Sequence, residues 1–274
     1  MSSKPIFEFG DDLVAQSYDN GLVPVLFDPW AEQLVENHGP WAGKSVLDLA
    51  SGTGIVAYQI GRRLGSSGRL IASDINVEML NLARRRCESL DVSSQFVVCS
   101  ADSLDCASES VDCVVCQQGF QFFPDKTAAS AEIFRVLKAG GKAILSTWRP
   151  VTECQIIGAV CEALELIGEY DTSELMRVPF DHMPSELLKN YFNAAGFEDV
   201  QLTRPSMDFV LEGGNEQILD VVFSTPIAPR LTEMSEEKRA QFKSELLSRT
   251  DILRRGGDTV GVMASDMLTA RKPG

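Results

Sequence analysis

The sequence has little of what several large protein classes require. It contains two histidines, and its seven cysteines are an odd number without the spacing of a disulfide framework or a zinc site. No apolar run approaches the ~18 residues that a membrane helix needs, and the first residues lack the apolar stretch of a secretory signal. We therefore expect a cytoplasmic protein with reduced thiols, no metal site and no membrane insertion.

Positive charge is also scarce. The chain has 39 Asp and Glu against 25 Lys and Arg, which gives a formal net charge of −14 at pH 7. Binding to nucleic acid depends on Lys and Arg that neutralise phosphates, so we expect no nucleic-acid partner. At 274 residues the chain is long enough for one large domain with a cap. The composition leaves the oligomeric state open.

What the sequence does contain is an alternation of short apolar runs and helical patterns. We expect strands at residues 45–49, 69–74, 95–99, 111–116 and 142–147, with helices at 54–64, 77–89 and 125–137. This alternation predicts an α/β fold with a doubly wound, Rossmann-like sheet that is covered by helices on both faces. Cys113 and Cys116 lie in one of these strands, where their odd spacing sends the two side chains to opposite faces.

The segments around this core suggest four parts. We expect an N-terminal helical segment at 1–44, the core at 45–205, a helical substrate cap inserted at 206–257 and a final core strand within 258–274. Within the second half, the patterns predict helices at 153–168 and 184–195, irregular chain at 177–184 and a strand at 198–203. Residues 215–255 read as mostly helical, and a long insertion of this kind is more often functional than loose.

The most informative segment is a glycine turn at residues 48–54, which reads Asp48-Leu49-Ala50-Ser51-Gly52-Thr53-Gly54. Glycine lets a ligand approach the backbone closely, because it has no side chain. The carboxylate of Asp48 would repel a pyrophosphate and attract an ammonium or a sulfonium. The turn therefore favours S-adenosylmethionine (SAM) over a dinucleotide.

Two further carboxylates follow the next strands. Asp74 ends the strand at 69–74 and can accept hydrogen bonds from both hydroxyls of a ribose, although Asp is also a favoured N-cap for the helix that begins near Val77. Asp102, between Ala101 and Ser103, can accept from an adenine amino group or can form a local Asx-turn.

The loop from Gln117 to Pro124 follows the fourth strand. We expect Gln117 and Gln118 to border the transferable methyl group, and the phenylalanines at 120, 122 and 123 to supply apolar walls, with at least one of them purely in the core. Trp148, just after the fifth strand, is expected to face the same cleft or to be buried at its rim.

Two alternatives to a SAM-dependent enzyme stay open. The residues from Gly52 to Ala57 also satisfy the dinucleotide pattern G-x-G-x-x-A, which would suit a nicotinamide-dependent oxidoreductase. No residue is an evident general base, which would suit a non-catalytic SAM-binding protein. The catalytic residue is therefore unknown, and the candidates for the substrate site are Tyr18, Gln121, Trp148 and His182.

Taken in order, five segments resemble the class I SAM-dependent methyltransferases, and in particular the small-molecule group similar to the ubiquinone/menaquinone-biosynthesis methyltransferases. They are VLDLASGTG at 46–54, SDINVEML at 73–80, SADSL at 100–104, VDCVVCQQGFQFFPD at 111–125 and RVLKAGGKAILSTW at 135–148. The resemblance implies a seven-stranded, mostly parallel sheet whose last strand is antiparallel. It also implies in-line transfer of a methyl group from SAM to an O, N or C atom of a small, partly apolar metabolite, with S-adenosylhomocysteine (SAH) as product.

The resemblance further implies a set of cofactor-binding residues. Residues 48–54 would hold the methionine part, Asp74 the ribose and Asp102 the adenine amine, and Tyr18 would close over the cofactor. The full set is Tyr18, Asp48, Ala50, Ser51, Gly52, Gly54, Asp74, Ile75, Met79, Ala101, Asp102, Ser103, Gln117 and Gln118. Ala50 departs from the glycine of the commonest motif. The fourth strand is not followed by the Asn/Asp-Pro-Pro-Tyr/Phe motif, and this absence argues against DNA or protein glutamine as the methyl acceptor. The identity of the acceptor stays open.

Overall fold

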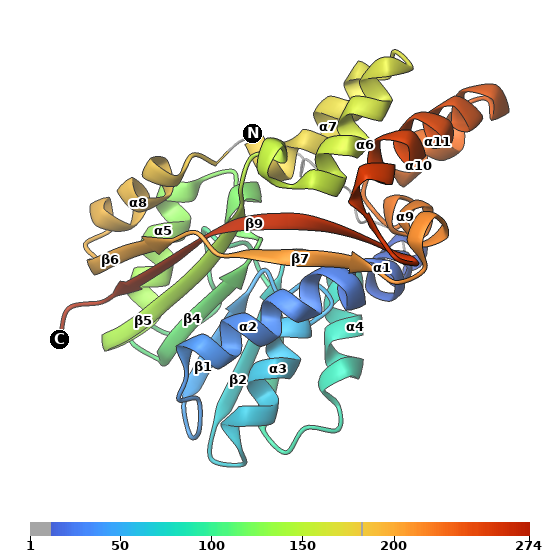
Figure 1. Ribbon diagram of the computed structural model, residues 1–274. Coiled ribbons are helices and arrows are strands. Elements are labelled where there is room, and N and C mark those ends of the chain that lie inside the picture. Colours follow the sequence, from blue (N-terminus) through green and yellow to red (C-terminus); the bar gives the residue numbers. More distant parts are fainter. Residues whose placement is uncertain (1–11, 182) are drawn as a thin grey trace.

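The computed structural model describes residues 12–181 and 183–274, and it is built around one mixed sheet (Figure 1). The order of its main path is β3-β2-β1-β4-β5-β9-β6, and β7 and β8 pair with β9. The strands are β1 (Ser45–Leu49), β2 (Arg69–Asp74), β3 (Ser93–Val98), β4 (Val111–Gln117), β5 (Leu137–Trp148), β6 (Glu198–Thr203), β7 (Ser206–Leu211), β8 (Arg254–Arg255) and β9 (Asp258–Arg271).

The directions of the strands confirm the expected sheet. The pairs from β3 through β5 are all parallel, while β9 runs antiparallel to both of its neighbours, β5 and β6. The carboxyl ends of β1, β2, β4 and β5 therefore meet at one edge. Ligands of open α/β sheets bind at this edge, where the strand order reverses.

Helices cover both faces of the parallel strands. On one face Val46 packs with residues of α2 (Asp28–His38), α3 (Ile55–Leu64) and α4 (Val77–Cys87). On the other face Leu47 packs with residues of α5 (Lys126–Val136) and α8 (Ser185–Ala194). Cys113 joins the first cluster and Cys116 the second, so the two thiols lie on opposite faces as predicted.

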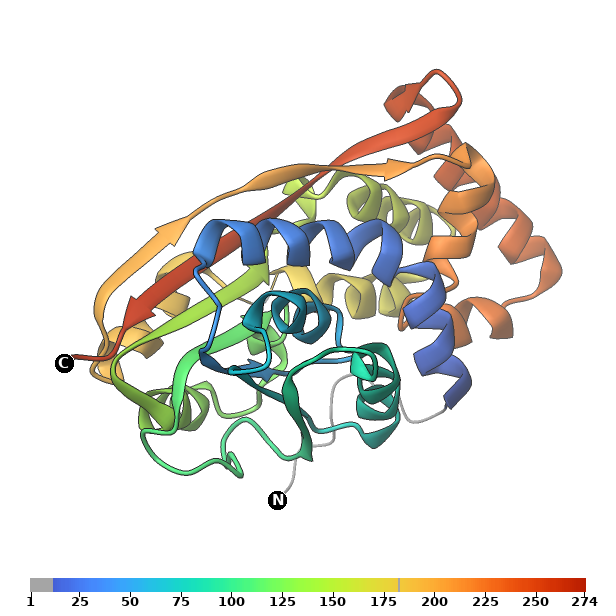
Figure 2. The same cartoon turned by 90° about the horizontal axis from the view of Figure 1, so that it is seen from below.

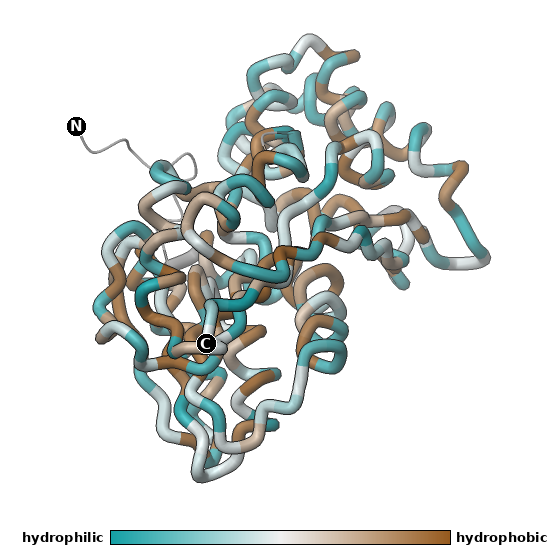
Figure 3. The backbone as a smooth tube through the Cα atoms, turned by 90° about the vertical axis from the view of Figure 1, so that its left-hand side faces the viewer, coloured by the Kyte–Doolittle hydropathy of each residue, from teal (hydrophilic) through white to brown (hydrophobic). Residues whose placement is uncertain are grey.

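The remaining helices form a second, helical lobe with its own buried cluster. Its members are α6 (Gln155–Leu166), α7 (Tyr170–Asp181), α9 (Gly214–Val222), α10 (Ala228–Glu233) and α11 (Glu236–Thr250). In Figure 3 this lobe stands beside the lobe of parallel strands, and both contain hydrophobic segments. The N-terminal chain, with α1 (Asp12–Gly21), a π-helical turn (Val23–Phe27) and α2, runs along β7 and joins the two lobes (Figure 2).

Three expectations from the sequence differ from the structure. Residues 177–181 are not irregular but belong to α7, where Pro179 lies in the last turn and costs only one backbone hydrogen bond. The segment 206–257 is not helical throughout, because residues 206–211 form β7, in which exposed side chains alternate with more buried ones and the backbone pairs with β9. The fifth strand begins at Leu137 rather than at 142, with an irregular register against β4. No described helix is long and apolar enough to cross a membrane.

Candidate active site

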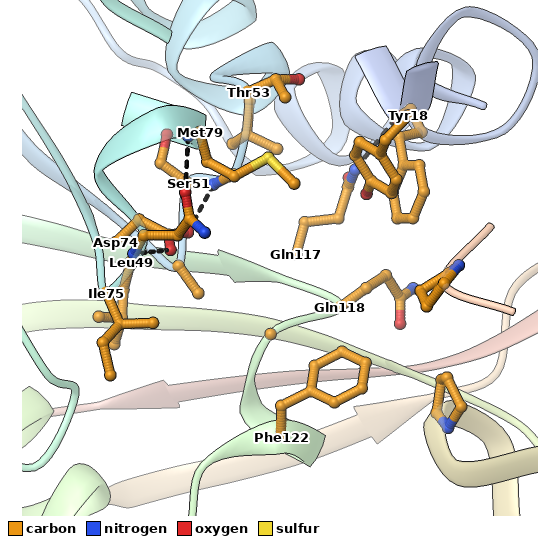
Figure 4. A pocket seen from close by; sticks show the side chains of 18 of the residues that line it. Tyr18, Leu49, Ser51, Thr53, Asp74, Ile75, Met79, Gln117, Gln118 and Phe122 are labelled. Carbon is orange, nitrogen blue, oxygen red and sulfur yellow. Dashed lines mark hydrogen bonds between the residues drawn. The ribbon is translucent and has the colours of Figure 1, made fainter. Parts of the chain in front are cut away.

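A cavity of about 810 Å³ opens at the carboxyl ends of the parallel strands (Figure 4). The ends of β1, β2 and β4 contribute Asp48, Asp74 and Gln117 to its wall, and β5 contributes Trp148. The N-terminal segment and the helical lobe close its other sides through Tyr18, Leu22, Leu26, Phe27, Ile157, Met176, Phe180 and Ile227. The cavity therefore lies between the sheet and the helical lobe.

The glycine turn after β1 contains three residues in the left-handed region of backbone space. Ala50, Gly52 and Gly54 all have positive φ angles, of 55°, 55° and 85°. A side-chain carbon placed on Gly52, which lines the cavity, would meet no atom within 4 Å. The same carbon on Gly54 would lie 2.6 Å from Cβ of Ala83, so Gly54 allows α3 and α4 to pack closely. Gly52 therefore leaves space in the cavity, whereas Gly54 is required for the packing of two helices.

Asp48 is buried, with an exposed fraction of 1%. Its Oδ2 accepts hydrogen bonds from Oγ of Ser51 at 2.6 Å and from the backbone nitrogen of Ala57 at 2.9 Å, which hold the glycine turn against α3. Burial, and to a smaller extent the nearby Asp74, raise the pKa of Asp48 to about 7 against the effect of these two hydrogen bonds. No described cationic side chain forms an ion pair with Asp48, and a bound cationic ligand could supply this charge.

Asp74 is held by the backbone on both sides. Its Oδ2 accepts from the nitrogen of Gly52 at 2.8 Å and its Oδ1 accepts from the nitrogen of Asn76 at 2.9 Å. The N-cap of α4 is Asn76, whose side chain accepts a hydrogen bond from the nitrogen of Met79. The alternative role of Asp74 as the N-cap of this helix is therefore wrong. Burial raises the pKa of Asp74 as well. The carboxylate thus links β2 to the glycine turn at the wall of the cavity.

The two glutamines after β4 are fixed by the N-terminal segment and by β9. Nε2 of Gln117 donates to the carbonyl of Phe27 at 3.0 Å. Nε2 of Gln118 donates at 3.1 Å to Oγ of Ser265, which itself donates to the carbonyl of Thr147 at 2.8 Å. These acceptors determine which end of each amide carries the nitrogen. Both side chains line the cavity between the sheet and a group of aromatic side chains that we call the aromatic wall, which consists of Phe27, Phe122, Phe123, Trp148 and Phe180.

Comparison of the sequence with known proteins finds methyltransferases. A family described as "Methyltransferase domain" matches residues 46–141. A ubiquinone/menaquinone biosynthesis C-methyltransferase from Xanthomonas campestris pv. campestris is 35% identical over 199 residues, which cover 67% of this chain and 79% of the relative. The corresponding enzyme from Cronobacter sakazakii is 31% identical over 186 residues, 62% of this chain and 73% of the relative. The chain belongs to the SAM-dependent methyltransferases.

Solved structures agree with this at the level of the fold. A phosphoethanolamine N-methyltransferase 2 from Haemonchus contortus, in complex with SAM, superposes with a TM-score of 0.63 at 16% identity, covering 100% of this chain and 61% of that one. The YcgJ protein from Bacillus subtilis gives 0.56 at 17% identity, covering 90% of this chain and 99% of that one. The oxidoreductase alternative depended on the glycine pattern alone, and the similarity in sequence to methyltransferases shows that it is wrong.

The cavity of this methyltransferase suits SAM. The buried carboxylate of Asp48 and the partly buried carboxylate of Asp74 would favour a cationic ligand with a diol, and the open space above Gly52 leaves room beside the turn. In Figure 4, Leu49, Ser51, Asp74, Ile75 and Met79 lie on one side of the cavity. Tyr18, Gln117, Gln118 and Phe122 lie on the other side.

Most of the residues expected in the site line the cavity, and some do not. Those that line it are Tyr18, Asp48, Ala50, Ser51, Gly52, Asp74, Ile75, Met79, Ala101, Gln117, Gln118 and Trp148. Gly54, Asp102, Ser103 and Gln121 are not among the lining residues. Gln121 lies in a 3₁₀ turn, Phe120–Phe122, whose successive side chains point in different directions, and it is Phe122 that reaches the cavity. His182 lies outside the described residues.

The aromatic wall was only partly expected. Phe120 is fully buried and packs against Tyr191 and Phe192, so it is the predicted core residue, while Phe122 and Phe123 line the cavity. Trp148 also lines it and stacks on Phe180 of α7, with 6.1 Å between ring centroids. Phe27, Met176, Phe180 and Ile227 also line the cavity and were not predicted. No local pattern indicates them, because only the tertiary fold brings their segments to the cavity.

The two glycines of the turn should respond differently to substitution. We expect Gly54→Ala to lower the free energy of unfolding by about 2–4 kcal/mol, because the new methyl group would collide with Ala83 and because alanine disfavours the φ of 85° at this position. Gly52→Ala should cost less stability but weaken SAM binding, since its methyl group would enter the cavity. Urea unfolding and calorimetry with SAM would separate the two effects, and equal losses of stability would contradict this assignment.

Asp48 should limit the stability of the ligand-free enzyme. A carboxyl group whose pKa is raised on folding stabilises the fold at low pH, and this contribution is lost as the pH rises toward about 7. We therefore expect Asp48→Asn to raise the free energy of unfolding by about 2–4 kcal/mol at pH 8, with a gain that shrinks toward pH 4. Urea unfolding of both proteins from pH 5 to pH 8 measures this. A gain that grows as the pH falls would contradict it.

Proposed function

We propose that the enzyme transfers the methyl group of SAM to a small, partly apolar metabolite bound against the aromatic wall of the cavity. The observation that carries this proposal is the composition of one continuous cavity. One buried and one partly buried carboxylate lie at the ends of β1 and β2, while aromatic and aliphatic side chains from the N-terminal segment and the helical lobe form the opposite wall. A cationic cofactor and an apolar acceptor would each meet the side chains that suit them.

We assign the cofactor roles by position on the sheet. Asp74 would accept the ribose hydroxyls, and Asp48 would face the ammonium group of the methionine part. Ile75, Met79 and Ala101 would contact the adenine. Gln117 and Gln118, which lie between the two walls, would border the methyl group. Asp102 and Ser103, which do not line the cavity, would take part only through a movement of their loop.

The chain's own contribution to the reaction would be positioning. Bound SAM supplies an already activated methyl group, so the acceptor needs alignment with it and protection from water. The fixed amides of Gln117 and Gln118 and the rings of Phe27, Trp148 and Phe180 supply a rigid, mostly apolar surface for this purpose. Burial and the charge of Asp74 raise the pKa of Tyr18 above that of a free phenol, so Tyr18 would bind as a protonated donor.

We also propose that residues 206–257 act as the substrate cap. Thr225, Pro226 and Ile227 from this segment line the cavity, although β7 and β8 make its two ends part of the strand layer. The relatives act in ubiquinone/menaquinone biosynthesis as C-methyltransferases. An apolar acceptor of that general kind, methylated on C, O or N, suits these walls. The shortage of positive charge and the unpaired thiols support a cytoplasmic enzyme without a nucleic-acid partner.

The proposal is tested by incubating the purified protein with SAM that carries a labelled methyl group and with a metabolite extract. We expect SAH to accumulate together with a labelled, organic-soluble product. Binding of SAM without any labelled product would favour the alternative of a non-catalytic SAM-binding protein. A label that appears only in protein or nucleic acid would contradict the acceptor class.

A further inference from the structure

Lys126 is the one cationic side chain among the described residues that line the cavity. It is the first residue of α5 and follows the loop of Phe122, Phe123 and Pro124, which line the cavity too. Its Nζ donates to the carbonyl of Phe123 at 2.8 Å, and this bond holds the ammonium group beside the aromatic loop. The position of this charge is therefore built into the wall where the acceptor is proposed to bind.

This ammonium group has no carboxylate partner in the part of the chain that the structure describes. Lys138, Lys238 and Lys272 each form an ion pair. Lys126 forms none, and it shares this with Lys44, Lys142, Lys189 and Lys243, none of which lines the cavity. Burial lowers the pKa of Lys126, so its charge is incompletely compensated by solvent and protein. A bound anion would supply the missing partner.

The other titratable groups of the cavity wall do not offer a base for the acceptor. They are Tyr18, Asp48, Asp74 and Cys99. The pKa values of Tyr18 and Cys99 are raised by burial, and both groups stay protonated near neutral pH. The two carboxylates are assigned to the cofactor. Among the described residues of the wall, an acceptor that arrives with a proton on its nucleophilic atom would therefore find no group to receive it, whereas an acceptor that arrives as an anion needs none.

We propose that the acceptor is an aromatic or otherwise apolar weak acid that binds as its anion, with the Lys126 ammonium as its counter-ion. This inference rests on the proposed function of the same cavity. The electron pair of the anion forms the new bond to the methyl carbon, the bond from sulfur to that carbon breaks, and its electron pair stays on sulfur. The anion and the sulfonium both become neutral, and no proton is released.

The test uses two probes of nearly equal shape, the anion 2-naphthoate and the neutral 2-naphthamide. Each is titrated by calorimetry into the protein saturated with SAH. We expect the protein to bind naphthoate roughly tenfold more tightly than naphthamide, as a charge-assisted hydrogen bond in a half-buried site allows. Lys126→Met should remove this preference while the affinity for naphthamide stays unchanged.

A second variant controls for the loss of a positive charge elsewhere. Lys189 of α8 is partly exposed and does not line the cavity, so Lys189→Met should keep the preference for naphthoate. Equal affinities for both probes, no binding of naphthoate, or a preference that survives Lys126→Met would overturn the inference. Failure of SAH itself to bind would instead overturn the proposed function, so the two failures are distinguishable.

Discussion

Replacing Asp74 by alanine is expected to weaken the binding of SAM and SAH by about 100-fold. The variant would lack the carboxylate that accepts two charge-assisted hydrogen bonds from the ribose hydroxyls, and at the lower end of the usual range these bonds are together worth about 3 kcal/mol. The substitution would also release the backbone nitrogens of Gly52 and Asn76, which the carboxylate now holds at 2.8 and 2.9 Å. Calorimetry with SAH measures the affinity directly.

Asp112 offers a matched control for this experiment. Its carboxylate also accepts from a backbone nitrogen, that of Ser45 at 2.7 Å, and pairs with Lys138 at 2.9 Å. It lies near the start of β4, at the edge of the sheet away from the cavity. Asp112→Ala should therefore reduce stability and leave the affinity for SAH unchanged. Equal affinities of the Asp74→Ala variant and the unmodified enzyme would refute the role of Asp74.

The affinity for SAM should fall when the pH drops below 7. Burial and the neighbouring Asp74 hold the pKa of Asp48 at about 7, so the free enzyme becomes protonated at this carboxyl group in mild acid. A cationic ligand favours the ionised form, and binding must then displace a proton. We expect roughly thirtyfold weaker binding at pH 5.5 than at pH 8, as a single group with this pKa gives. The raised pKa of Asp74 acts in the same direction.

The Asp48→Asn variant separates this effect from general changes with pH. An asparagine oxygen can still accept from Ser51 and Ala57, so the glycine turn should keep its shape. The variant should bind SAM more weakly at pH 8 and show a shallower dependence on pH. An affinity that rises in acid, or a slope that is unchanged in the variant, would mean that Asp48 does not face the cationic part of the ligand.

The residues of the site that lie at the ends of the parallel strands could be predicted from the sequence. The bounds of β1 and β6 were predicted to the residue, and Asp48, Asp74, Gln117 and Gln118 line the cavity because strand ends converge at one edge. Short-range patterns determine these features. The glycine turn shows the same in part, since Gly52 and Gly54 readily adopt their positive φ angles, whereas the positive φ of Ala50 has no signal in the sequence.

The acceptor side could not be predicted in this way. Phe27, Phe180 and Ile227 come from segments that are far apart in the chain, and only the packing of the two lobes brings them to one wall. Residues 177–184 were predicted to be irregular, yet residues 177–181 belong to α7 and Pro179 lies in its last turn. The run of residues 206–211 is so short that it was included in the helical insertion. Only its pairing with β9 defines it as the strand β7.

The central claim is that a cationic nucleoside binds between the carboxylates of Asp48 and Asp74 and the amides after β4. A crystal structure of the enzyme with SAH tests it most directly. We expect the ribose hydroxyls within hydrogen-bond distance of the Asp74 carboxylate and the sulfur beside Gln117 and Gln118, pointing toward Trp148. A nucleoside that binds elsewhere, or a ribose that does not contact Asp74, would contradict the account.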